Sequence, residues 1–346
     1  MKLIRVNKKN WRKLLTIATI LALLIFIITS GGHIIDTFRG LRKADLWVLW
    51  LMIPLEVLNY YAQTLLYRDA LKTMGYKITS KFLYRFSLEL NFIATLLPSA
   101  GLSAVSYTNL RLKSQSVSGA DATLLHLIKT ISVFISFLAL LVLGILLMAL
   151  GGKASSIIIL FASVVITILV ILTGGAFFIV GSDKRIDGFF TWVTLFLNKV
   201  VKTFRPRIHE AINIVRAKKV FNDLHNSYML FRNDPSQFKS PFLWGLLANF
   251  TEVAVLYVVY IAFGHWINPG VIILAYAVAN LGGFLSVLPG GVGVYESLMT
   301  IVLATAGVSA SLSLPVTITY RILNTIIQIA PGYVLYQKAL IFIENN

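Results

Sequence analysis

The chain alternates long apolar runs with short polar segments. The apolar runs are long enough to cross a bilayer, because about 20 apolar residues in a helix span its hydrocarbon core. The runs cover residues 11–30, 46–67, 82–107, 121–150, 156–180, 241–263, 271–306 and 314–336. This pattern predicts an all-α polytopic membrane protein.

Two of the runs contain residues that interrupt a helix. The first has Leu-Pro-Ser-Ala-Gly at 97–101, and the second has a proline and three glycines at 289–293. Proline removes a backbone hydrogen bond and glycine weakens a helix. A broken backbone persists at bilayer depth only inside protein or beside a water-filled cavity. We therefore predict about six full transmembrane helices plus two re-entrant (broken) helix hairpins. A kinked spanning helix with close glycine packing is the alternative.

The two halves of the chain resemble each other in the order of their polar residues. In each half a glutamate-bearing run, with Glu56 or Glu252, comes before a Leu-Pro break. An asparagine, Asn91 or Asn280, lies between the glutamate and the break. Counting the runs gives the two glutamate-bearing helices opposite directions. We therefore predict an inverted repeat, an architecture of transporters.

The distribution of charge gives this arrangement an orientation. The net charge is +17, and the basic residues gather in short segments beside the apolar runs, as they do in cytoplasmic loops. The predicted single membrane domain, 1–346, divides into a basic N-terminus at 1–13, a first half at 14–180, a basic amphipathic region at 181–240 and a second half at 241–337. We predict that both termini and the region 181–240 are cytoplasmic, and we expect no nucleic-acid partner.

The basic region contains apolar residues at helical spacing. Phe189, Trp192 and Phe196 begin this series. They predict an amphipathic helix that either lies on anionic lipid or packs on neighbouring helices. A second, more polar helix is predicted at about 207–231.

Several ionisable residues lie inside the apolar runs, where each needs a partner or a purpose because charges are costly at bilayer depth. On the last run, Arg321, Asn324 and Gln328 form one polar stripe of a helix. The stripe has two interpretations. Arg321 binds a lipid phosphate while a glutamate binds a cationic group, or Arg321 forms a buried ion pair with a glutamate that stabilises the bundle.

The candidate lipid- or anion-binding residues are grouped around the two breaks. The first group is Pro289, Gly290, Gly291, Gly293, Glu296, Arg321, Asn324, Gln328 and Asn280. The second half-site is Glu56, Glu89, Asn91, Pro98, Gly101 and Glu252. The reason for the first group is that a half-helix beginning near Gly293 would present backbone N–H groups to an anion.

The sequence gives little support for thiol, metal or enzyme chemistry. The chain has no cysteine, which excludes thiol catalysis and cysteine-bound clusters. Its five histidines are scattered without ligand spacing, so we expect no metal and no cofactor. Walker, G-x-S-x-G and H-E-x-x-H motifs are absent, and we expect no catalytic residues.

The motif Leu-Pro-Gly-Gly-Val-Gly-Val-Tyr-Glu at 288–296, followed by Tyr320-Arg321 and Pro331-Gly332, resembles the transmembrane region of the lysylphosphatidylglycerol synthase/flippase family (multiple peptide resistance factor). The segment 97–101 matches the family's first broken helix less tightly. The resemblance extends from about residue 10 to residue 340. It implies a multi-pass protein of a bacterial plasma membrane that has a role in lipid metabolism and antimicrobial peptide resistance.

In that family a separate cytosolic domain attaches the amino acid to the lipid, and this chain stops about ten residues after its last run. We therefore expect the family activity of phosphatidylglycerol lysyltransferase to be absent from this polypeptide. The resemblance implies a flippase or scramblase for an anionic or aminoacylated phospholipid, such as lysyl-phosphatidylglycerol. One alternative is the membrane subunit of a lipid-modifying system with a separately encoded synthase or transferase. Another is a small-solute secondary transporter. Membrane phospholipids are the expected partners, and a homo-oligomer is left open.

Overall fold

A computed structural model describes residues 44–96, 100–152, 156–204, 225, 228–285 and 291–345. All the regular secondary structure in these ranges is helical. The helices are α2 (Leu46–Leu49), α3 (Met52–Thr73), α4 (Ser80–Leu96), α5 (Ala100–Lys113), α6 (Gly119–Leu150), α7 (Ser156–Val180), α8 (Asp183–Phe204), α10 (Ser236–Ala262), α11 (Pro269–Leu285), α12 (Val294–Thr305) and α13 (Ala310–Asn345). The chain is therefore the all-α polytopic membrane protein that its sequence predicts.

The helices differ in how well they match a membrane span. Among the described residues, α6, α7 and α10 are long and apolar enough to cross a bilayer, while α11 and α12 are apolar but shorter. Helices α3 and α13 have 22 and 36 residues, which is sufficient length, but they carry polar side chains in their middle. The predicted N-terminal segment 1–13 and first run 11–30 lie outside the described residues.

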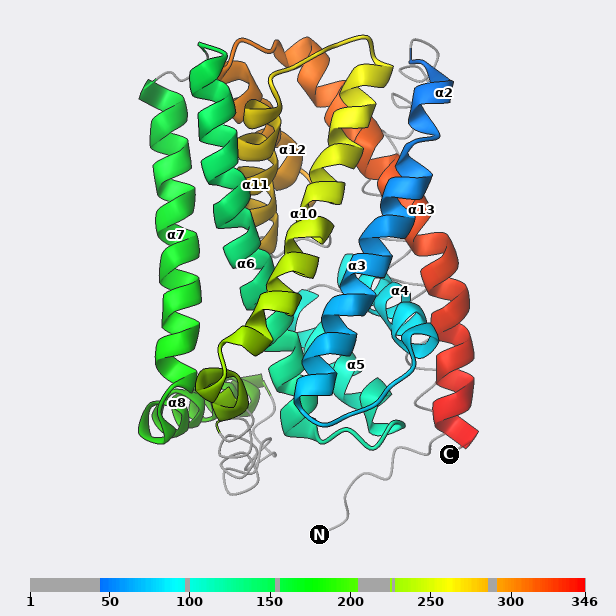
Figure 1. The fold of residues 1–346 in the computed structure, drawn as a ribbon, viewed down its shortest axis with the longest axis vertical. Coiled ribbons are helices and arrows are strands. Elements are labelled where there is room, and N and C mark those ends of the chain that lie inside the picture. Colours follow the sequence, from blue (N-terminus) through cyan, green and yellow to red (C-terminus); the bar gives the residue numbers. More distant parts are fainter. Residues whose placement is uncertain are drawn as a thin grey trace.

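Each interrupted run forms two helices that pack against each other, α4 with α5 and α11 with α12. In Figure 1 the pair α4–α5 lies in the lower half of the molecule and the pair α11–α12 in the upper half. This is the arrangement expected of two hairpins that enter from opposite faces. The breaks themselves, with Pro98, Pro289 and Gly290, lie outside the described residues.

The contacts between helices repeat in the two halves. Helix α3 packs along α10, α4 packs on α13 and α11 packs on α6. Helix α5 contacts α6, and α12 contacts α13. Exchanging α3 with α10, α4 with α11, α5 with α12 and α6 with α13 leaves the α3–α10 contact unchanged and converts each of the other four contacts into another member of the set. Such a contact pattern is the one that an inverted repeat produces.

Glycines allow two of these corresponding contacts to be close. A Cβ atom on Gly332 of α13 would lie 2.6 Å from Cβ of Phe92 and 2.8 Å from the carbonyl oxygen of Leu88, both on α4. In the other half, a Cβ atom on Gly270 of α11 would collide with the Gly144 carbonyl oxygen of α6. Small residues at helix crossings bring backbones together in membrane proteins, and here they join each hairpin to a long helix of the opposite half, α13 for the first hairpin and α6 for the second.

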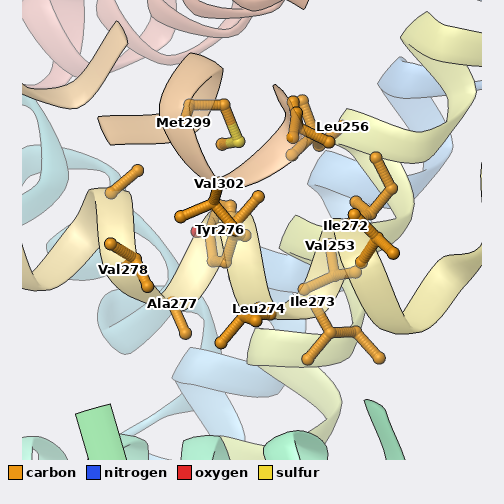
Figure 2. Close-up of a cluster of buried hydrophobic side chains, with 14 of the residues drawn as sticks. Val253, Leu256, Ile272, Ile273, Leu274, Tyr276, Ala277, Val278, Met299 and Val302 are labelled. Carbon is orange, nitrogen blue, oxygen red and sulfur yellow. The ribbon is translucent and has the colours of Figure 1, made fainter. Parts of the chain in front are cut away.

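Apolar side chains fill the space between the helices of the upper half. Figure 2 shows Met299 and Val302 of α12 near Tyr276 of α11, with Val253 and Leu256 of α10 at the right of the view near Ile272 of α11. A second buried cluster, with Phe86 and Leu124 among its members, lies around α4, α5 and the beginning of α6. These clusters hold both hairpins against the long helices.

Several helix ends follow local signals in the sequence. Ser118 caps α6, accepting a hydrogen bond from the Asp121 N–H at 3.0 Å. Helix α10, however, begins at Ser236 and contains Pro241, so the predicted start at 241 is wrong. Asp234 explains the earlier start. Its carboxylate accepts hydrogen bonds from the backbone N–H of Ser236 at 3.2 Å and from the side-chain amide of Gln237 at 2.9 Å.

A Pro-Gly pair is expected to break a helix, but α13 continues through Pro331 and Gly332 to Asn345. A proline removes one hydrogen bond from a helix, and the close packing of Gly332 on α4 holds the helix together at that point.

Helix α8 forms in the basic region and lies at the lower end of the bundle in Figure 1. Phe189, Trp192 and Leu195 are exposed on it. The side chain of Phe196 and most of 207–231 lie outside the described residues.

A polar contact joins α3 to α10 at the lower end. The Asp69 carboxylate accepts hydrogen bonds from the Ser240 hydroxyl, from Trp244 Nε1 at 3.0 Å and from Arg68 Nε at 2.9 Å. Burial acts to raise the pKa of Asp69, but the hydrogen bonds from Ser240, Arg68 and Trp244 outweigh it and leave the pKa below its usual value. Asp69 therefore stabilises the folded state as an anion.

Candidate functional site

Two carboxyl groups lie at the contact between the long helices α3 and α10. Glu56 of α3 is 1% exposed, and both of its carboxyl oxygens are buried without a hydrogen-bond partner in the described part of the chain. Glu252 of α10 is near enough to act electrostatically on Glu56. Glu252 is only partly buried and accepts hydrogen bonds from the Tyr276 hydroxyl at 3.5 Å and the Tyr320 hydroxyl at 3.4 Å. The two predicted site residues thus meet, in different environments.

The polar stripe of α13 faces these carboxyl groups. The Asn324 amide donates to the Tyr320 hydroxyl at 3.4 Å and is near Glu252. The Gln328 amide is near the Glu56 carboxyl, although without hydrogen-bond geometry. We define the central polar site as Glu56, Glu252, Tyr276, Tyr320, Asn324 and Gln328. It unites four residues that the sequence indicated, from both halves of the chain.

Buried amides extend from the central polar site along α3. Asn59 donates to the Ala248 carbonyl oxygen at 2.8 Å and to the Thr251 hydroxyl at 3.0 Å, both on α10. Gln63 donates to Asn59 at 2.6 Å and accepts from Asn91 of α4 at 3.5 Å. The predicted Asn91 is therefore linked to α10 through two residues that the sequence analysis missed. Their signal was present, because positions 59 and 63 follow Glu56 on the same face of a helix.

Arg321 forms an ion pair with Glu296 of α12. Glu296 also accepts a hydrogen bond from the Gly293 N–H at 2.8 Å, which caps the first turn of α12. The guanidinium carbon of Arg321 lies 4.9 Å from the ring centre of Tyr295. The structure thus places the carboxylate of Glu296 at the helix N-terminus where the sequence predicted an external anion. This arrangement favours the ion-pair interpretation of Arg321.

Glu89 is paired within the first hairpin. Arg111 Nε of α5 donates to its carboxylate at 2.8 Å, and the Tyr107 hydroxyl donates at 2.7 Å. Glu89 is 1% exposed and Arg111 is 7% exposed. Arg111 also lies over the Phe82 ring, 4.4 Å from its centre. These contacts join α4 to α5, and they place Glu89 in an ion pair rather than in the central polar site.

Three other candidate residues lie in the hairpins: Asn280 and Gly291 in the second and Gly101 in the first. Gly291 has φ 63°, and a Cβ atom on it would lie 2.7 Å from the Cα of Gly283; the hairpin therefore requires glycine there. Asn280 donates to the Tyr276 carbonyl oxygen of its own helix at 2.8 Å. It also lines an apolar cavity of about 180 Å³ with Phe134, Phe137 and Leu169 between α6, α7 and α11. Gly101 lies in α5.

Comparison with known proteins agrees with this membrane architecture. A UPF0104 membrane protein of Methanothermobacter thermautotrophicus is 29% identical to the chain over 136 residues, which are 38% of this chain and 39% of that protein. The match thus spans about two fifths of the relative's length. The family described as "Lysylphosphatidylglycerol synthase TM region" matches residues 13–332. Because this match includes most of the sequence and all the residues of the central polar site, the chain belongs to the lysylphosphatidylglycerol synthase transmembrane-region family.

Proposed function

We propose that the protein is a flippase or scramblase that moves an aminoacylated phospholipid, such as lysyl-phosphatidylglycerol, across the membrane. The family places it among membrane proteins of lipid metabolism. The observation that carries the proposal is the pair of carboxyl groups, Glu56 and Glu252, at the contact between α3 and α10. Charged groups at such depth are costly and mark transport pathways when they lack a permanent counter-ion.

The chemistry of the central polar site favours a cationic head group. Arg111 of the first hairpin and Arg321 of α13 already have carboxylate partners, Glu89 and Glu296 respectively. Among the described residues, the hydrogen-bonding groups next to Glu252 are by contrast neutral: two tyrosine hydroxyls and the nearby Asn324 amide. An ammonium group on the lipid could replace these weak contacts with a charge-assisted hydrogen bond. Lys129 of α6, which acts on Glu252 electrostatically from farther away, is the proposed partner of the lipid phosphate.

The two hairpins give this site a route to both membrane surfaces. They lie in opposite halves of the molecule (Figure 1), and the central polar site includes a residue of α11 and three of the adjoining α13. Movement of one hairpin against the long helices would open the site toward one surface at a time, as in transporters built from inverted repeats. We further propose that the basic lower end faces the cytoplasm of a bacterial cell.

A translocation assay tests this function. Purified protein is reconstituted into liposomes that contain fluorescent lysyl-phosphatidylglycerol or fluorescent phosphatidylglycerol, and a membrane-impermeant reductant quenches the outer leaflet. We expect the wild-type protein to expose inner-leaflet lysyl-lipid faster than empty liposomes do, and Glu252→Gln to slow this at least tenfold, about 1.4 kcal/mol of transition-state stabilisation. Asp234→Asn is the control, because Asp234 is exposed and asparagine also caps helices. A wild-type rate equal to that of empty liposomes would exclude the proposed function.

A further inference from the structure

Glu56 has an environment that does not suit a permanent charge. Its carboxyl group is buried, with no hydrogen-bond donor in contact among the described residues. A carboxylate is stabilised by water at a protein surface or by several hydrogen-bond donors in a protein interior. A buried carboxyl group without either is stable when it is protonated, because protonation removes the charge.

The groups around Glu56 come from several helices, and none of those in the described residues is a cation in contact with it. Glu252 faces it from α10, and Gln328 faces it from α13. The hydroxyl groups of Tyr60 on its own helix, Tyr276 on α11 and Tyr320 on α13 lie within electrostatic range. The negative charge of Glu252 therefore adds to the cost of ionising Glu56.

The two carboxyl groups are not equivalent. Glu252 accepts hydrogen bonds from two tyrosine hydroxyls and is attracted electrostatically by Lys129. It therefore retains a negative charge more easily than Glu56 does. When two acids share a site in this way, one proton stays on the acid that has fewer hydrogen-bond donors to stabilise a negative charge. In the empty site that acid is Glu56, and the pair carries a single negative charge.

We propose that Glu56 is a proton-binding site that exchanges its proton for a cationic lipid head group. Binding of an ammonium group at Glu252 neutralises the charge that kept Glu56 protonated, so the O–H bond of Glu56 breaks and its proton passes to water. The occupied site then holds two carboxylates and one ammonium, with the same net charge as the empty site. Translocation of the head group in one direction would thus be coupled to proton movement in the other. This inference rests on the proposed function, because it requires a cationic lipid.

Thermodynamic linkage makes the exchange measurable at equilibrium. If binding releases one proton, affinity for the lipid rises with pH by about tenfold per pH unit wherever Glu56 is protonated in the empty protein and ionised in the complex. The measurement belongs between about pH 5 and pH 7, where the amino groups of the lipid stay charged.

The experiment is titration calorimetry of purified protein with short-chain lysyl-phosphatidylglycerol, in buffers with different enthalpies of ionisation. We expect the wild-type protein to release about one proton per bound lipid. Glu56→Gln, which mimics the protonated acid in shape, should bind the lipid with no proton release and no dependence of affinity on pH. Asp234→Asn should behave as the wild-type protein does.

The outcomes separate the two claims. Lipid binding without proton release by the wild-type protein would overturn the proton site and leave the proposed function intact. Absence of lipid binding and of translocation would overturn both. Proton release that persists in Glu56→Gln would assign the proton to another group. Infrared spectroscopy provides a test without ligand: the band of a protonated carboxylic acid should be present in the empty wild-type protein and weaker in Glu56→Gln. An unchanged band would also contradict the proposal.

Discussion

Replacement of Arg321 by glutamine removes the charged partner of Glu296 and leaves that carboxylate between α12 and α13. Loss of one partner from a fully buried ion pair costs about 3–5 kcal/mol. The Arg321 and Glu296 side chains are 17% and 10% exposed, and the Gly293 N–H still stabilises Glu296. We therefore expect Arg321→Gln to lower the free energy of unfolding by about 2–3 kcal/mol. Glu296→Gln should cost a similar amount, because it removes the carboxylate partner of the guanidinium group at membrane depth.

The double variant distinguishes an ion pair from a ligand site. With both charges removed, the free energy of unfolding should return to within about 1 kcal/mol of the wild-type value, which gives a coupling energy of about 2 kcal/mol or more. Unfolding by dodecyl sulfate in mixed micelles, followed by circular dichroism, provides the measurement, with Asp234→Asn as the control. If Arg321→Gln keeps the wild-type stability but abolishes lipid translocation, Arg321 acts on the ligand and the ion-pair interpretation is refuted.

Three further predictions concern contacts that join the helices. Glu89→Gln and Arg111→Gln should each destabilise the protein by about 3–5 kcal/mol, because this pair is more deeply buried, and the double variant should recover most of the loss in the same unfolding assay. Asp69→Asn should cost about 1–2 kcal/mol at neutral pH. The pKa of Asp69 is lowered by folding, so its contribution is complete above the usual carboxyl range and is lost as pH falls; melting curves should show the difference from the wild-type protein shrinking below about pH 4. Gly332→Ala should cost about 1–3 kcal/mol because the added methyl group would overlap α4, whereas Gly174→Ala, where a Cβ atom meets no neighbour within 4 Å, should change the unfolding midpoint little.

The sequence predicts the helices well where local signals decide the structure. The predicted span 156–180 is α7, Ser156–Val180, because a turn at Gly151-Gly152 separates it from the preceding helix. A Leu-Pro motif interrupts each of two apolar runs, and it correctly predicts that each run forms two helices. The start of α10 is misplaced because Asp234, which lies before the apolar run, supplies the hydrogen bonds that begin the helix.

The partners of the charged residues require tertiary structure. The sequence places Glu89, Glu252 and Glu296 in apolar runs, but nothing in their spacing shows that Arg111 neutralises the first and Arg321 the last. Tyr276 is missed for a similar reason: a tyrosine in an apolar run is usually part of the core, and its hydroxyl contact with Glu252 depends on how α11 packs on α10. Local rules also fail at Pro331, where packing on α4 preserves the helix.

The contact pattern explains why two acids meet at the centre of the protein. In an inverted repeat, a helix at the pseudo-two-fold axis packs against its own counterpart, as α3 packs along α10. A glutamate facing the axis from one half therefore meets the glutamate of the other half, and like charges are brought together. The arginine pairs do not follow this symmetry, because Arg111 joins the two arms of one hairpin while Arg321 joins α13 to α12. Both arginines thus have carboxylate partners of their own, and among the described residues Glu56 and Glu252 have no arginine partner, as the proposed proton and head-group sites require.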